Sequence, residues 1–178
     1  MNERKAAQAA ARFLSASGGS MDRLKFVKLM YLMDRTALLW RGAPVTNDVY
    51  FSLPMGPVPS GVYDLIRHSN ENSFWARHIA RPNNRTVKLI SDPGNDQLSE
   101  AEEDLIDWLA DKYKDWHPTK LKDFTHQLQE WKDPGRGSIR IDIAEILEAA
   151  NRSPQDANTI KCDLEGTRHV EALFSPFT

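Results

Sequence analysis

The chain has 178 residues, enough for one domain whose hydrophobic core needs neither a disulfide nor a metal ion. Its formal net charge is −2 and its sequence pI is about 6.2, which argues against broad electrostatic binding to nucleic acid. The single cysteine, Cys162, excludes a disulfide within the chain and is typical of a reducing cytoplasm.

The N-terminal stretch MNERKAAQAAARFL is too polar for a signal peptide. No segment approaches the roughly 20 apolar residues that a membrane-spanning helix needs. We therefore expect a cytoplasmic protein without membrane segments. Alanine and other good helix formers predict a first helix over residues 4–16, which ends at the Ser-Gly-Gly-Ser sequence of residues 17–20.

The second predicted helix, residues 21–41, is apolar on most of its surface. Twelve of the seventeen residues from Leu24 to Trp40 are apolar, with no Gly or Pro among them. Its polar residues fall on one stripe: Lys25, Lys28, Arg35 and Thr36. Such a helix is expected at the centre of its domain. Asp34 lies opposite the stripe, so the pattern predicts a carboxylate on a buried face.

A stiff bend follows, in which three prolines and two glycines fall within residues 54–61. Proline fixes φ and removes an N–H, and glycine permits positive φ, so the segment predicts a rigid turn. An unpaired buried carboxylate is costly and needs donors. We expect these donors for Asp34 to come from a small set: the backbone of Met55, Gly56 and Val58, or the side chains of His126 and Tyr63.

Three roles stay open for Asp34. It can anchor the bend as a structural residue, act as a catalytic base, or contact a partner directly. The structural role is favoured, because the surroundings are apolar and the bend offers N–H groups that need an acceptor.

The remaining elements are mostly helical. Ser60 is predicted to cap a short helix that ends near residue 66, and residues 74–90 are predicted to form a β-hairpin. Ser99 and Glu102 form a capping box at the start of another helix. Two further helices are predicted over residues 119–131 and 141–150. The predicted fold is therefore mainly α: a compact single domain over residues 1–150, built around the buried helix 21–41 with one small inserted hairpin, and a C-terminal extension of uncertain structure over residues 151–178.

No catalytic or metal-binding motif is present in the sequence. It contains no GxSxG, P-loop, GxGxxG or HExxH pattern, and no two histidines are three or four residues apart. Lysines surround Trp116, but interleaved aspartates cancel their charge and weaken the case for a nucleic-acid site. We expect no enzyme activity, no metal and no cofactor.

Several segments, in this order, resemble the Panacea domain, the SocA-like antitoxin family that is also known as phage-associated protein. The segments are Lys28–Asp34 (KLMYLMD), Gly42–Thr46 (GAPVT), Gly56–Val58 (GPV), Val62-Tyr63, Leu98–Glu102 (LSEAE) and Thr125–Trp131 (THQLQEW). The resemblance covers residues 24–133. The hairpin turn at residues 82–84 departs from the family pattern, and nothing after residue 150 matches it.

The resemblance implies an antitoxin of a two-gene toxin–antitoxin system that neutralises a cognate protein toxin by direct binding. One branch of the family implies instead a proteolytic adaptor that delivers its toxin to a ClpXP-type protease. A third hypothesis, a hydrolase or nuclease centred on Asp34 and His126, rests on the residues alone. The oligomeric state stays open.

The candidate site residues fall into two groups. The structural motif residues are Asp34, Gly56, Pro57, Val58, Tyr63, His126 and Trp131. The candidate anchors for a protein partner are Met55, Trp75, Trp116 and Phe174. Aromatic side chains dominate binding hot spots, so these anchors depend on whether they are exposed or belong to the core.

Overall fold

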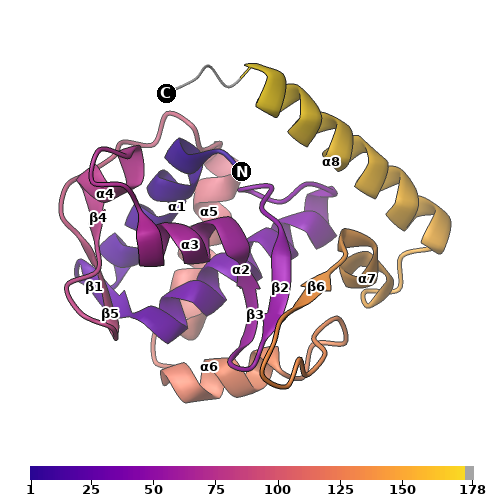
Figure 1. Cartoon of the computed structure of the whole chain (residues 1–178), viewed down its shortest axis with the longest axis horizontal. Helices are drawn as coiled ribbons and strands as arrows, with labels where there is room; N and C mark the ends of the chain where they lie inside the picture. Colours follow the sequence, from indigo (N-terminus) through magenta and orange to yellow (C-terminus); the bar gives the residue numbers. More distant parts are fainter. Residues whose placement is uncertain (175–178) are drawn as a thin grey trace.

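The computed structural model describes residues 1–174, apart from the side chains of residues 168 and 170–174. Within this part, the chain is mainly helical and also forms two small antiparallel sheets (Figure 1). The helices are α1 (Glu3–Ala16), α2 (Arg23–Arg41), α3 (Ser60–His68), α4 (Phe74–His78), α5 (Glu100–Tyr113), α6 (Pro118–Thr125), α7 (Ile143–Glu148) and α8 (Pro154–Phe174). The strands are β1 (Ser20–Asp22), β2 (Tyr50–Leu53), β3 (Gly56–Pro59), β4 (Ile79–Ala80), β5 (Thr86–Leu89) and β6 (Ile139–Ile141).

Helix α2 begins and ends with clear capping signals. The Asp22 carboxylate accepts hydrogen bonds from the backbone N–H groups of Leu24 and Lys25, and Gly42 ends the helix with a φ of 72°. The helix packs against α5 and α6 and against strand β3. Its buried residues include Phe26, Met30 and Leu38 as well as several polar side chains. The predicted helix 21–41 is thus present with nearly the expected bounds.

The sheet content is larger than the single predicted hairpin. Residues 74–78 form helix α4, capped by Ser73, and only β4 and β5 pair as a hairpin. Strand β1 adds to β5 and completes a three-stranded sheet in the order β1-β5-β4. Local pattern alone cannot show this third strand, because its partner lies far along the chain.

The proline-rich bend is itself a hairpin in a second sheet. Strands β2 and β3 pair in antiparallel fashion around the two-residue turn Pro54-Met55, and β6 pairs with the other edge of β2. The sheet order is therefore β3-β2-β6, and β3 lies at an edge. Prolines are compatible with such an edge strand because they lack the N–H that a central strand needs.

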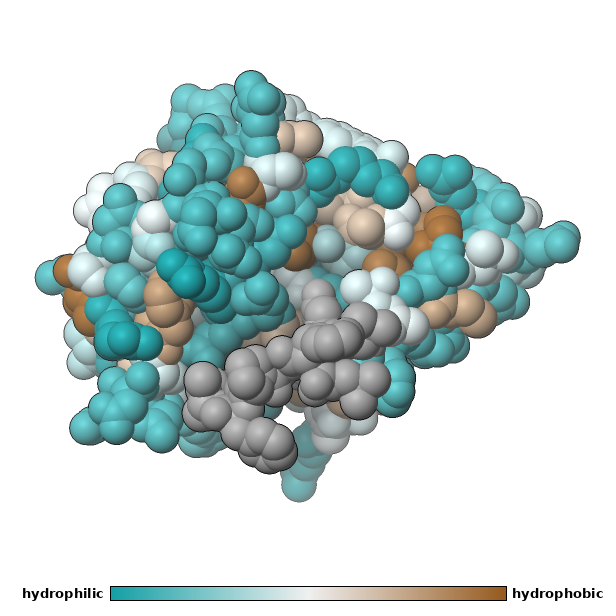
Figure 2. Space-filling model, turned by 90° about the horizontal axis from the view of Figure 1, so that it is seen from above, coloured by the Kyte–Doolittle hydropathy of each residue, from teal (hydrophilic) through white to brown (hydrophobic). Residues whose placement is uncertain are grey.

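The C-terminal half differs in its element bounds from the prediction. Helix α6 ends at Thr125, so residues 126–131 leave the helix and cross toward the second sheet. The chain after residue 150 forms the long helix α8, which lies beside α7 in Figure 1. Ala157 and Leu164 are buried on its inner face. In Figure 2, polar residues cover most of the upper face of the molecule and apolar residues form only small groups. No helix of the described residues is both long enough and apolar enough to cross a bilayer.

Candidate functional site

The β2–β3 hairpin is held against α2 by a buried lysine. The Lys28 amino group donates a hydrogen bond to the Pro57 carbonyl oxygen at 2.8 Å, and the side chain has no exposed surface. Burial, together with the positive charge of Lys122, lowers the pKa of Lys28 to about 7. Lys28, one of the residues of the polar stripe on α2, therefore faces the hairpin and not solvent.

Gly56 allows the hairpin to approach this lysine. Its φ of 97° lies in a region that side-chain-bearing residues rarely adopt. A Cβ atom at this position would lie 2.9 Å from Lys28 Nζ and 2.9 Å from Thr125 Oγ1. Both the backbone conformation and the lack of space therefore require glycine.

The segment after α6 also packs against the hairpin. The rings of His126 and Trp131 stack with centroids 4.0 Å apart and an interplanar angle of 5°. Trp131 Nε1 donates to the Leu53 carbonyl oxygen at 3.2 Å. His126 Nε2 is buried without a hydrogen-bond partner among the described residues, and burial and the nearby lysines lower the pKa of His126. The fold thus brings Gly56, Pro57, His126 and Trp131 into one site from two distant parts of the chain.

The structure thus brings together segments that the sequence analysis singled out, and a single family model covers all of them. The model described as antitoxin SocA-like, Panacea domain, matches residues 26–132. The chain belongs to the Panacea family. The match begins in α2 and ends directly after Trp131, so it contains the whole site, whereas α1, β6, α7 and α8 lie outside it. No curated protein and no solved structure matches the chain.

Asp34 of this Panacea chain is fully buried, as expected, but its donors come from elsewhere. Its carboxylate accepts hydrogen bonds from the Thr46 backbone N–H at 2.8 Å, from the Thr46 hydroxyl, and from the Tyr50 hydroxyl at 3.0 Å. The prediction that the donors to Asp34 come from the backbone of the bend, or from the side chains of His126 or Tyr63, is therefore wrong. Proximity in the fold decides the outcome, since the chain from residue 45 to 50 runs past Asp34 before the hairpin begins.

The hydrogen bonds of Asp34 indicate a structural role. Burial raises its pKa to about 6, and the bonds from Thr46 and Tyr50 oppose this rise. Because the carboxylate has no exposed surface and already accepts from two residues, it offers nothing to a substrate. The geometry therefore gives no support to Asp34 as a catalytic base.

Two further buried carboxylates of the Panacea fold were missed by sequence reasoning. Glu130 accepts from the Tyr31 hydroxyl at 2.9 Å and from Arg35 Nε at 2.5 Å. Asp48 accepts from the backbone N–H groups of Gly61 and Val62 at the start of α3. Neither carboxylate has a local sequence signal, because its partners lie far away in the chain or on another element. Among the described residues, no group of three His, Cys, Asp or Glu side chains could hold a metal ion.

The four candidate anchors differ in exposure. Met55 is 52% exposed at the hairpin turn, whereas Trp75 is 1% exposed and packs against Phe26 in the core. Trp116 is partly buried and packs against Phe124. The side chain of Phe174 lies outside the described residues. Among the three anchors whose side chains the structure describes, Met55 is thus the most exposed.

Two exposed tryptophans were not among the candidates. Trp40 at the end of α2 is 60% exposed and Trp108 on α5 is 42% exposed, and their ring centroids are 5.4 Å apart. The neighbouring residues Leu105 and Leu109 are buried, so Trp108 lies outside the buried face of α5.

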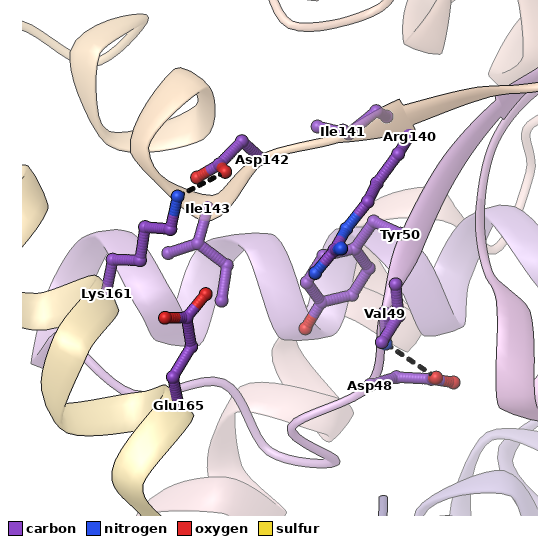
Figure 3. A pocket seen from close by; sticks show the side chains of 9 residues that line it. All are labelled: Asp48, Val49, Tyr50, Arg140, Ile141, Asp142, Ile143, Lys161 and Glu165. Carbon is purple, nitrogen blue, oxygen red and sulfur yellow. Dashed lines mark hydrogen bonds and ion pairs between the residues drawn. The ribbon is translucent and has the colours of Figure 1, made fainter. Parts of the chain in front are cut away.

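Helix α8 packs against the Panacea domain near residues 48–50, and only a small recess lies between them. Figure 3 shows Lys161 of α8 paired with Asp142, at 2.5 Å, and Glu165 directed toward the same recess. Arg140 of β6 extends beside Tyr50 on the opposite wall. The recess has a volume of only about 10 Å³, room for no more than a water molecule. It is therefore a packing seam and not a ligand site.

Proposed function

We propose that the chain is the antitoxin of a two-gene toxin–antitoxin system and neutralises a cognate protein toxin by direct binding in the cytoplasm. The match of residues 26–132 to the SocA-like Panacea domain is the observation that carries this proposal. No enzymatic role is proposed, because the family is one of antitoxins and the buried carboxylates act as hydrogen-bond acceptors for the fold.

The packing of the motif residues supports a binding scaffold. Lys28, Gly56 and Trp131 fix the hairpin against α2 and the segment after α6. This leaves the turn at Met55 exposed on a rigid support. A rigid surface loses little conformational entropy on binding, which favours a stable complex with another protein. A stoichiometric interface of standard size would bury about 800 Å² on each partner.

Co-expression tests the proposal directly. The open reading frame adjacent to the gene for this chain is induced alone and together with the chain, and cell growth is measured. Growth arrest that the chain relieves, and a complex of fixed stoichiometry on purification, are expected. An adjacent protein that is harmless when expressed alone would remove the basis of the proposal.

The same cells separate direct binding from proteolytic delivery. The half-life of the adjacent protein is measured with the chain present, in cells with and without a ClpXP-type protease. Simple occlusion predicts equal half-lives in the two strains. A half-life that shortens only when the protease is present would replace direct neutralisation by the adaptor mechanism.

A further inference from the structure

An apolar hollow opens beside the hairpin turn, between the start of α2 and helix α3. It has a volume of about 230 Å³. Its apolar walls are formed by Leu24, Val27, Leu53, Met55, Val58 and Tyr63. The hollow is therefore bounded by the same hairpin that Lys28 and Trp131 hold in place, so its shape is fixed by the buried contacts of the fold.

The size of the hollow favours a side chain over a small molecule. Pockets for small molecules usually have volumes of about 300 to 1,000 Å³ and enclose most of the ligand. This hollow is smaller, and Met55 at its rim is half exposed. Its dimensions therefore fit one large apolar side chain that projects from the surface of another protein.

The charged residues that line the hollow are both basic. Arg23 and the stem of Lys28 line it, and the Arg67 guanidinium lies over the ring of Tyr63, 5.3 Å from its centroid. No acidic side chain is among its lining residues. An occupant with a carboxylate next to its apolar side chain would therefore match the hollow in both shape and charge.

The adjacent strand edge is closed to strand addition. The Ser60 N–H donates to the Val49 carbonyl oxygen and so points toward β2. Because the backbone groups of successive residues point to opposite sides of a strand, those of Pro57 and Pro59 point to the outer edge of β3. Proline has no N–H to donate there, and Lys28 occupies the Pro57 carbonyl oxygen. A partner therefore cannot add a strand at this edge beside the hollow, whereas the hollow itself can receive an inserted side chain.

We propose that this hollow is the anchor site for the toxin, and that it receives a large apolar toxin side chain flanked by a carboxylate that pairs with Arg23 and Arg67. The inference rests on the proposed antitoxin function and names the surface and the chemistry through which it acts. The anchored side chain supplies the buried apolar contact, and the arginines set its orientation.

Four substitutions in and around the hollow test the proposal. Met55→Glu places a carboxylate at the rim, Leu24→Trp fills the hollow, and Arg23→Glu and Arg67→Glu reverse the surrounding charge. Trp40→Glu is the matched control: it changes an exposed apolar residue on the same helix, 16 residues from Leu24 and thus about 24 Å away. Each variant is first compared with wild type by circular dichroism and thermal midpoint, so that only folded proteins are scored.

The probe is the purified protein encoded by the adjacent gene, and its affinity is measured by calorimetry. Met55→Glu and Leu24→Trp are expected to weaken binding at least tenfold, and Trp40→Glu less than twofold. The losses from Arg23→Glu and Arg67→Glu should shrink as salt is raised, because salt screens the charge pairs.

The outcomes separate this site from the proposed function. Binding and growth rescue that survive both Met55→Glu and Leu24→Trp would overturn the anchor site and leave the antitoxin function intact. Loss of binding with Trp40→Glu alone would place the interface at the Trp40–Trp108 pair, which also overturns the proposal. A wild-type chain that fails to bind the adjacent protein refutes the antitoxin function, and the anchor site with it.

Discussion

Replacement of Lys28 by methionine should change how the stability of the protein depends on pH. Lys28 is fully buried, and burial lowers its pKa from 10.5 to about 7. In the unfolded chain the same amino group regains its ordinary pKa. Between pH 7 and 10.5 the unfolded chain therefore binds more protons than the folded protein, so the free energy of unfolding rises with pH in this window.

The size of the effect follows from the two pKa values. With a folded pKa of about 7 and an unfolded pKa of 10.5, the contribution of Lys28 changes by about 3 kcal/mol between pH 7 and pH 9.5. Lys28→Met abolishes this titration but also leaves the Pro57 carbonyl oxygen without its donor, at a cost of about 1–3 kcal/mol that does not vary with pH. The diagnostic quantity is consequently the pH slope and not the stability at one pH.

Urea denaturation followed by tryptophan fluorescence measures this slope. The free energy of unfolding of wild type should gain about 3 kcal/mol relative to Lys28→Met when the pH is raised from 7 to 9.5. Lys88→Met, which removes an exposed lysine from β5, is the matched control, and its pH dependence should parallel that of wild type. If wild type and Lys28→Met change in parallel, Lys28 remains charged in the folded protein and the reasoning is refuted.

Three further substitutions test the other buried contacts. Gly56→Ala forces a side chain into positive φ against Lys28, so urea denaturation should show a loss of at least about 1–3 kcal/mol; an unchanged midpoint would contradict the steric argument. Burial raises the pKa of Asp34 in the folded protein from 3.8 to about 6, so between these two pH values the folded protein binds more protons than the unfolded chain. The free energy of unfolding of wild type should therefore fall by about 3 kcal/mol as the pH rises from 3.8 to about 6. Asp34→Asn should lack that slope, and equal slopes in the two proteins would show that the carboxylate does not titrate in this way. Glu130→Gln breaks the pairing with Arg35 and should lower the free energy of unfolding by about 3 kcal/mol, measured by the same method, whereas a neutral effect would mean that the pair adds no net stability.

Local sequence signals predicted several elements well. The apolar run from Leu24 to Trp40 predicted α2, and the Ser99–Glu102 capping box predicted the start of α5. The short helix predicted at Ser60 is α3, but Pro59 is its N-cap and Ser60 is its first residue. These succeed because helix periodicity and capping depend on residues within a few positions of one another. The resemblance to the Panacea domain was confirmed by the family match at nearly the same bounds. The division into a domain over residues 1–150 and a C-terminal extension stays a prediction.

The amino-acid sequence alone determined helices α1, α2 and α5, a stiff bend over residues 54–61, the presence of a buried carboxylate at Asp34 and the family. Only the tertiary structure decided which groups meet: Thr46 and Tyr50 at Asp34, and the Pro57 carbonyl oxygen at Lys28. The physical reason is that a hydrogen bond between distant segments leaves no periodic trace in the sequence. Its donor and acceptor are brought together by packing, and the packing is settled by the whole core at once.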